Sequence, residues 1–344
     1  MDGLSIFSCF AVSLSISLLI VLSKPLHTRL SADTLQGDQK FHQGSVPRVG
    51  GLAIFFSLIF AYVLFFTDYL FFTILISGLP VFITGLLEDI FKSVSARLRL
   101  LAAILSATLF IYLSGYYFTS IDIYLFDEIF NLLFLFPILT IIAVAALSNA
   151  INIIDGFNGL ASGSVVFMAL AIAYLGYQNG DILVMKIALL FAVSVAGFFL
   201  VNFPKGLLFL GDAGAYLNGY ILGVLAILLV ERNEQIIPLV LLVIFAYPII
   251  ELLFSIYRKT LRKGHRPDQP DKVHFHMLVY RRYGRKWSRT TLHQNSLTGL
   301  LMLSFSALAL FYVLFLPVTR ASALLYFFII LFVYLYVYKR MSLN

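Results

Sequence analysis

The feature that most constrains this chain is a succession of long apolar segments that leaves little sequence for anything else. Eleven such segments, each of 17–22 residues, can be marked at roughly 3–23, 50–67, 69–87, 98–116, 129–148, 159–177, 183–201, 214–230, 236–257, 297–317 and 321–338. A helix of about 20 apolar residues crosses the hydrocarbon core of a bilayer. Hydrophobic residues make up 61% of the chain and charged residues 12%, which excludes a soluble enzyme with a single anchor. The sequence therefore predicts an all-α polytopic integral membrane protein with about eleven transmembrane helices.

The distribution of Lys and Arg predicts how these helices are oriented. If successive segments cross in alternate directions, 21 of the 24 basic residues lie on one side, and Lys186, Arg232 and Arg320 lie on the other. The basic side of a membrane protein faces the cytoplasm. We therefore expect the N-terminus outside, the C-terminus inside, and a long basic cytoplasmic loop at 258–296. A basic face beside anionic lipid headgroups accounts for the net charge of +7 without a nucleic-acid partner.

No composition shift divides the chain. The sequence contains no internal repeat and no second soluble domain, so we expect residues 1–344 to form one membrane-embedded domain. The first apolar run is too long for a signal peptide and lacks its positive n-region, so we interpret it as a permanent span. Cys9 is the only cysteine, which excludes a disulfide scaffold.

Polar residues gather with Gly and Pro at the predicted cytoplasmic helix ends. The pair Gly50-Gly51 opens the second segment, whose helix N-terminus could bind phosphate; an ordinary basic juxtamembrane turn is the alternative. The adjacent acids Glu88 and Asp89 could be functional, since charge at a membrane helix end needs a partner. They could equally be a solvated helix end paired with nearby bases. Asp212 could cap a helix or bind Mg²⁺.

Four amide or acid side chains recur at every third residue between two apolar segments: Asn149, Asn152, Asp155 and Asn158. On an α-helix that spacing spreads them across one side of the helix end, before glycines break it. A plain helix–turn–helix needs one cap. We therefore interpret the set as a binding surface for a base or a metal ion.

Two further features lie in and before the long loop. His274 and His276 are two residues apart and would share a face in an extended segment. Because no zinc-ligand spacing accompanies them, they suit a diphosphate better than zinc. Glu251 lies inside the ninth apolar segment, where an ionisable residue is a functional candidate; pairing with the cytoplasmic cluster would also explain it.

The joint placement of these clusters favours one kind of chemistry. A transporter would place its ionisable groups near the membrane midplane, whereas here they collect at one interface. Acids, amides, bases and helix N-termini at an interface suit phosphoryl transfer, assisted by a divalent metal, between a soluble anion and a lipid headgroup. A secondary transporter or lipid flippase with a charged cytoplasmic gate is the alternative from another class, and a catalytically inactive scaffold is a third.

The motifs resemble those of a known family, in family order along nearly the whole chain. The family is the polyprenyl-phosphate N-acetylhexosamine-1-phosphate transferases, glycosyltransferase family 4, which is related to phospho-MurNAc-pentapeptide translocase. The matching motifs are Pro47-Arg48-x-Gly50-Gly51, Glu88-Asp89, Asn149-x-x-Asn152-x-x-Asp155-Gly156-x-x-Gly159, Gly211-Asp212-x-Gly214 and His274-x-His276.

The resemblance implies a reaction, a cofactor and a set of site residues. The phosphate of undecaprenyl phosphate would attack the sugar-bearing phosphorus of a UDP-amino sugar, releasing UMP and forming undecaprenyl-diphospho-sugar, with Mg²⁺ or Mn²⁺ required. Catalytic roles would fall to Glu88, Asp89 and Asp212, and the metal to Asp212 and Asn152. Asp89 would deprotonate or orient the lipid phosphate, although a phosphate monoester is already mostly ionised at neutral pH. The substrate-binding residues would be Lys40, His42, Arg48, Arg99, Asn149, Asp155, Asn158, Arg266, His274 and His276.

Two departures bear on the branch of the family. Glu88 replaces the usual first aspartate, and Met277 stands where a further histidine often follows. The translocase branch carries three consecutive histidines, so the transferases that initiate surface polysaccharides such as O-antigen are the nearer match. Their donors include UDP-GlcNAc and UDP-deoxy-amino sugars, between which the sequence does not choose. We expect the enzyme in the bacterial inner membrane, where a homodimer is a plausible assembly.

Overall fold

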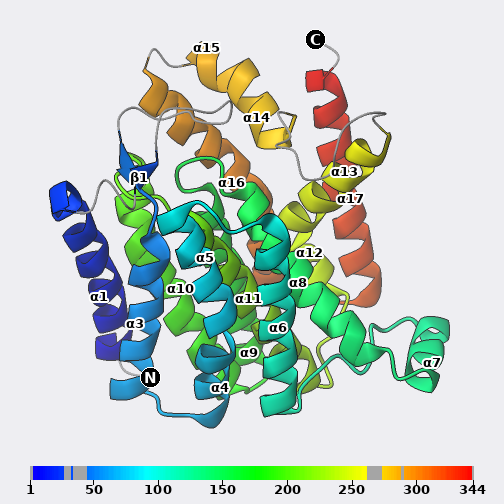
Figure 1. The fold of residues 1–344 in the computed structure, drawn as a ribbon. Helices are drawn as coiled ribbons and strands as arrows, with labels where there is room; N and C mark the ends of the chain where they lie inside the picture. Colours follow the sequence, from blue (N-terminus) through cyan, green and yellow to red (C-terminus); the bar gives the residue numbers. More distant parts are fainter. Residues whose placement is uncertain (1–2, 27–31, 34–44, 262–272, 288–289, 343–344) are drawn as a thin grey trace.

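The computed structural model of the protein is a bundle of long helices (Figure 1). It describes residues 3–26, 32–33, 45–261, 273–287 and 290–342. The predicted substrate-binding residues Lys40, His42 and Arg266 lie outside the described residues.

Short connections join most of the successive elements, and β1 and β2 pair antiparallel with Ala32 opposite Pro47. The described elements are α1 (Gly3–Leu22), β1 (Ala32–Asp33), β2 (Val46–Pro47), α3 (Gly50–Leu64), α4 (Tyr69–Ser77), α5 (Leu79–Phe91), α6 (Ala96–Ser114), α7 (Tyr124–Leu132), α8 (Phe136–Ile154), α9 (Leu160–Gln178), α10 (Ile182–Asn202), α11 (Gly211–Glu231), α12 (Val240–Ile244), α13 (Ala246–Leu261), α14 (Phe275–Val279), the π-helical turn η1 (Tyr280–Gly284), α15 (Arg285–Trp287), α16 (Thr291–Phe315) and α17 (Arg320–Ser342).

Nine helices in the described part of the chain are long and apolar enough to cross a membrane. One of them, Tyr69–Phe91, combines α4 and α5 across Gly78. The other two predicted segments are also helical but shorter: α3 has 15 residues, and segment 236–257 is divided between α12 and α13. The protein is therefore a polytopic helical membrane protein, and the total of eleven crossings remains the prediction made from sequence.

The core of the bundle is helix α11, which lies among the other helices in Figure 1. Every residue from 211 to 230 is buried, as expected of a helix that is apolar on nearly all sides. Glycines let its neighbours approach at backbone distance. A Cβ on Gly219 would lie 2.4 Å from Cα of Ser148, and one on Gly51 would lie 2.4 Å from the backbone nitrogen of Gly214. Helices α3, α5, α8 and α9 pack around α11 and so fix its first turn at one end of the bundle.

The outer helices expose large apolar side chains, as helices in contact with lipid do. Examples are Leu19 of α1, Leu101 of α6 and Phe332 of α17. Helices α1 and α17 stand at opposite edges of the bundle, and α7 projects from its side (Figure 1). None of the residues of α7 is buried.

The polar end of the bundle holds most of the predicted site. Helix α1 begins and α17 finishes at opposite ends of the bundle (Figure 1). Segment 258–296, predicted as a loop, contains α14, η1 and α15, and α16 begins within it at Thr291. The first turns of α16 contact the turn after α8: the backbone N–H of Asn158 donates to Asn295 Oδ1 at 2.7 Å.

Candidate active site

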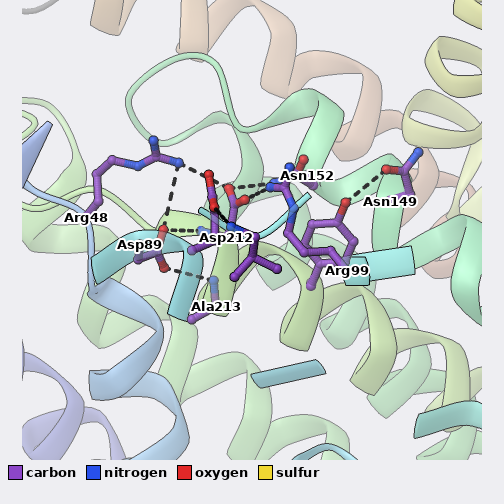
Figure 2. A network of polar contacts seen from close by, with 10 residues as sticks. Arg48, Asp89, Arg99, Asn149, Asn152, Asp212 and Ala213 are labelled. Carbon is purple, nitrogen blue, oxygen red and sulfur yellow. Dashed lines mark hydrogen bonds and ion pairs between the residues drawn. The ribbon is translucent and has the colours of Figure 1, made fainter. Parts of the chain in front are cut away.

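Four helix ends and one loop bring the predicted charges together. Asp89 comes from the end of α5, Arg99 from the start of α6, Asn152 from the end of α8 and Asp212 from the start of α11, while Arg48 precedes α3. Figure 2 shows these side chains pointing toward one another. Residues separated by more than 100 positions in the sequence thus form one cluster.

Asp89 binds the backbone at the start of α11. Its carboxylate accepts the N–H groups of Asp212 at 2.8 Å and Ala213 at 3.0 Å, and the residue is buried. The first N–H groups of a helix have no partner within it and carry the positive end of the helix dipole. Gly211 makes this approach possible, because a Cβ there would lie 2.5 Å from Asp89 Oδ2. Asp89 therefore fixes the turn that carries Asp212.

Asp212 receives the cationic side chains of the site. Its Oδ1 accepts from Arg48 Nη2 at 3.1 Å and from Asn152 Nδ2 at 3.2 Å, and its Oδ2 pairs with Arg99. Arg48 also lies 3.8 Å from Asp89, so two carboxylates face two guanidinium groups. The Arg48 side chain is 31% exposed and Asp212 only 7%. The cluster is therefore a buried ion-pair network that opens to solvent at Arg48.

Arg99 has hydrogen-bonding capacity left for a ligand. Within the described part of the chain, its buried Nε has no hydrogen-bond partner. The guanidinium group lies 5.7 Å from the ring centre of Tyr216, whose hydroxyl donates to Asn149 Oδ1 at 3.2 Å. Sequence reasoning missed Tyr216. Its position four residues after Asp212, on the same face of α11, was the signal that could have found it.

Asp155 lies beside the cluster, just beyond the end of α8. Burial raises the pKa of its carboxyl to about 7, and the nearby Arg48 guanidinium acts in the opposite direction. This carboxyl can therefore exchange a proton near neutral pH. Asn149 and Asn152, which precede it on the helix, complete the polar side of α8 that was predicted.

The structure gives Asn158 and Glu88 partners away from Asp212. Helix α8 ends at Ile154, so the three-residue spacing no longer keeps Asn158 on the same side. Its side-chain amide donates to the carbonyl of Pro204 at 3.1 Å. Glu88 accepts the backbone N–H of Val94 at 2.8 Å and thereby closes the turn between α5 and α6. Their predicted substrate and catalytic roles remain predictions.

The phosphate-binding interpretation of the glycine pair is wrong. The N–H of Gly50 donates to the carbonyl of Phe209 at 3.0 Å, and that of Gly51 donates to the carbonyl of Leu210 at 3.0 Å. These groups are therefore unavailable to a phosphate. The pair serves instead to bring the start of α3 against the start of α11.

The two histidines of the motif lie against the turn that follows α8. Their rings stack with centroids 5.4 Å apart and planes within 8°. His276 packs edge-on against Phe157 at 5.6 Å, and a Cβ on Gly156 would lie 3.1 Å from its Nε2. The rings share a face, but not in the extended segment that was predicted: His274 caps α14, and His276 lies within that helix.

The donor set allows a divalent cation. No three His, Cys, Asp or Glu side chains form a metal-binding group among the described residues. The available donors are the Asp212 carboxylate and the Asn152 amide, and such oxygen ligands suit Mg²⁺. Both Asp212 oxygens already accept from cationic or amide groups. Metal binding would therefore require a guanidinium group to move, and an anionic substrate would provide its new partner.

The fold and this site define a polytopic membrane protein with a buried ion-pair cluster at one end. The model of glycosyl transferase family 4 matches residues 71–230. The chain is 30% identical over 295 residues to the undecaprenyl-phosphate alpha-N-acetylglucosaminyl 1-phosphate transferase of Thermotoga maritima, covering 84% of this chain and 85% of that protein. It is 29% identical over 272 residues to the probable undecaprenyl-phosphate N-acetylglucosaminyl 1-phosphate transferase of Bacillus subtilis, covering 78% and 75%.

A third relative supports the same assignment. The undecaprenyl-phosphate alpha-N-acetylglucosaminyl 1-phosphate transferase of Yersinia pestis is 31% identical over 253 residues, which cover 71% of this chain and 68% of that protein. The chain belongs to the polyprenyl-phosphate N-acetylhexosamine-1-phosphate transferase family, glycosyl transferase family 4.

Proposed function

We propose that the protein transfers N-acetylglucosamine 1-phosphate from UDP-GlcNAc to undecaprenyl phosphate. An oxygen of the lipid phosphate forms a bond to the sugar-bearing phosphorus, the bond from that phosphorus to UMP breaks, and UMP leaves with the electron pair. The observation that carries this proposal is the buried cluster around Asp212, with two guanidinium groups at the end of a membrane bundle. The names of the relatives supply the lipid and the sugar.

In this proposal the arginines bind the phosphate groups of the substrates. Arg48 lies at the open edge of the cluster, and Arg99 keeps a buried donor, Nε, for an anion. A planar guanidinium group with several donors matches phosphate oxygens. Asp89 orients the start of α11 and is not needed as a base, because both its oxygens bind backbone N–H groups and the lipid phosphate is largely ionised already.

We propose that Mg²⁺ or Mn²⁺ binds through Asp212 and Asn152. When bound, the ion would neutralise charge on the diphosphate of the donor. The carboxylate and amide oxygens support this assignment, as argued above, and Arg48 and Arg99 would then pair with the substrate phosphates.

An apolar cavity of about 260 Å³ offers a place for part of the prenyl chain. Its lining comes from α8, α11, α12, α13 and the segment before α7, and includes Val144, Leu147, Gly223, Leu242 and Phe245. Leu147 precedes Asn149 by two residues, which is about 3 Å along a helix. A chain lying there would bring its phosphate to the polar end of α8.

The particular donor and product are part of the proposal. UDP-GlcNAc is favoured over a UDP-deoxy-amino sugar because the relatives are named for N-acetylglucosamine. We propose that the product begins a surface polysaccharide such as O-antigen, that the enzyme acts at the cytoplasmic face of the bacterial inner membrane, and that it forms a homodimer. A transporter or flippase is not favoured, because the relatives are named as transferases.

The test is UMP release by purified, detergent-solubilised protein. UMP should appear with UDP-GlcNAc only when undecaprenyl phosphate and Mg²⁺ are both present, and EDTA should stop its release until Mg²⁺ is restored. Asp212→Asn should reduce the rate about 100-fold or more, because charge stabilisation dominates such catalysis. Glu128→Gln is the matched control, since Glu128 is exposed on α7. Folded protein that releases no UMP from UDP-GlcNAc or UDP-deoxy-amino sugars would overturn the proposal.

A further inference from the structure

Glu251 is a buried acid that the ion-pair cluster does not use. It lies on α13 with no exposed surface. A buried carboxylate is costly unless it is paired or fully hydrogen-bonded. Its partners come from outside its own helix: the start of α14 and helix α17.

Three donors converge on the Glu251 carboxylate. Oε1 lies 2.7 Å from His274 Nδ1 and accepts the backbone N–H of Phe275 at 3.2 Å. Oε2 accepts the hydroxyl of Tyr334 at 2.7 Å. An ionised carboxylate can only accept hydrogen bonds. The hydrogen between Glu251 and His274 therefore belongs to Nδ1 of the histidine.

This hydrogen bond determines which nitrogen of His274 is available to a substrate. With Nδ1 bound to Glu251, Nε2 is the nitrogen on the opposite edge of the ring, and the side chain retains 11% exposure. The ring also stacks on His276, which lies against Phe157 and Gly156 in the turn after α8. Fixing His274 therefore fixes the whole motif relative to the polar end of α8.

Helix α17 completes this support. Besides Tyr334, it provides Tyr338, whose hydroxyl donates to the carbonyl of Val273 at 2.9 Å, one residue before His274. Arg258 of α13 contacts both Val273 and Tyr338. A helix that otherwise faces lipid thus binds the histidine motif at two points.

We propose that Glu251 and Tyr334 are positioning residues that hold the Nδ1–H of His274, so that Nε2 faces the diphosphate of the donor substrate and, in the imidazolium form, donates its hydrogen to a phosphate oxygen. The assignment of the diphosphate rests on the proposed function. The hydrogen-bonded geometry does not. Residues that orient a functional histidine through its second nitrogen typically change activity about 10- to 100-fold when they are replaced.

The first test is the tautomer of His274 in the full-length protein. Nitrogen NMR of ¹⁵N-histidine-labelled protein at pH 8, with His274→Gln used to assign the signal, reports which ring nitrogen carries hydrogen. Wild type should carry it on Nδ1. In Glu251→Leu no oxygen faces Nδ1, so the form with hydrogen on Nε2 should appear. Hydrogen on Nε2 alone in wild type, or an unchanged signal in Glu251→Leu, would overturn the proposal.

The second test is the kinetics of UMP release. Glu251→Gln should lower kcat/KM about 10- to 100-fold, with KM for UDP-GlcNAc rising more than KM for undecaprenyl phosphate. Tyr334→Phe should also lower kcat/KM and raise KM for UDP-GlcNAc, each by a smaller factor than Glu251→Gln does. Two control variants should have the kinetic constants of wild type. They are Glu234→Gln, at an exposed position after α11, and Tyr336→Phe, at a position on α17 that is 56% exposed.

The two tests separate the inference from the proposed function. Wild-type protein that releases no UMP but carries hydrogen on Nδ1 of His274 would contradict the function and support the positioning. Suppose instead that wild type releases UMP, and that Glu251→Gln and Tyr334→Phe lose affinity equally for UDP-GlcNAc and undecaprenyl phosphate. That result would support the proposed function and contradict the positioning of His274. If Glu251→Gln does not fold, judged by its size-exclusion profile, the Tyr334→Phe and Tyr336→Phe pair decides in the same way.

Discussion

The two aspartates of the ion-pair cluster differ in what their oxygens already bind. Asp89 accepts two backbone N–H groups of α11, whereas Asp212 faces Arg48, Arg99 and Asn152. Asp89 therefore controls where Asp212 lies, and Asp212 is the acid that we propose binds the metal ion.

Replacing Asp89 by Asn should reduce stability as well as activity. The amide has one accepting oxygen, and its NH₂ group would oppose the N–H of Asp212 or Ala213. Losing a charge-assisted bond at a buried helix N-terminus should cost about 1–3 kcal/mol. Thermal unfolding in detergent, measured beside UMP release, should show both falling. A variant with wild-type thermal stability and no activity would instead indicate a direct chemical role for Asp89.

Replacing Arg99 by Lys should weaken donor binding although the charge is kept. Lysine lacks the planar fork and the stacking on Tyr216. We expect KM for the UDP-sugar to rise about tenfold, the equivalent of one charge-assisted hydrogen bond. Arg320→Lys is the control. Arg320 pairs with Asp122, which is not part of the ion-pair cluster, and the Arg320 side chain is 70% exposed. An unchanged KM would show that Arg99 serves Asp212 alone.

The residue types of the site were predictable, but several of their contacts were not. Charge and amide groups at membrane helix ends are costly without partners, which made Asp89, Asn152 and Asp212 candidates, and the family resemblance added Arg99. The contact between Glu251 and His274 depends on how α13 returns toward α14, and helical periodicity carries no information about that path. Asn158 does not share the side of α8 that carries Asn149 and Asn152, because the helix ends at Ile154, four residues before it.

At the scale of elements, backbone contact between α5 and α11 holds the cluster together. Gly85 of α5 faces the first turn of α11, and a Cβ there would lie 2.5 Å from Cα of Ala213. This separation is too short for any side chain. The position of Asp89, four residues later on α5, therefore depends on a glycine.

Gly85→Ala should push α5 away from α11 and lengthen the bonds of Asp89. Overpacking of this kind costs about 1–3 kcal/mol, so we expect a lower unfolding temperature and reduced UMP release. Gly3→Ala is the matched control, since a Cβ at Gly3 would meet nothing within 4 Å. Equal unfolding temperatures of the two variants would mean that α5 and α11 accommodate the extra methyl group without losing stability.

Element types followed from the sequence more reliably than element boundaries did. Each of the eleven apolar runs is helical, because their length and apolarity permit little else in a membrane. The ninth run is broken between Ile244 and Ala246. Pro248 has no N–H to donate to the carbonyl of Ile244, and this signal was present in the sequence. The helices within 258–296 depend on contacts with distant turns, which no local pattern predicts.

At the scale of the whole molecule, α11 is anchored at both ends. Asp89 binds its first turn, and Arg232, directly after its last residue, donates to Asp181 Oδ2 at 2.8 Å. Asn233 donates to the same oxygen at 3.2 Å. Burial alone would raise the pKa of Asp181, but the hydrogen bonds from Arg232 and its neighbours prevail and lower it.

This outer anchor should make stability depend on acid pH. The lowered pKa of Asp181 means that its stabilising contribution is present above the unfolded value of about 3.9 and is lost as pH falls below it. Asp181→Asn should therefore lower the unfolding temperature at pH 7, with a cost of about 1–3 kcal/mol. The difference from wild type should shrink below about pH 4. A difference that is independent of pH would contradict the role of the ionised carboxylate.

The position of α17 in the chain has a consequence for how the protein is made. Every motif of the site has been translated by residue 276, yet Tyr334 and Tyr338, which hold the histidine motif, come about 60 residues later. A ribosome adds residues at about 5–20 per second, so a nascent chain carries the whole motif set for several seconds before the α17 part of the support exists. Premature termination after α16 would leave a product that contains every recognisable motif and Glu251 but lacks the two tyrosines that hold Glu251 and Val273.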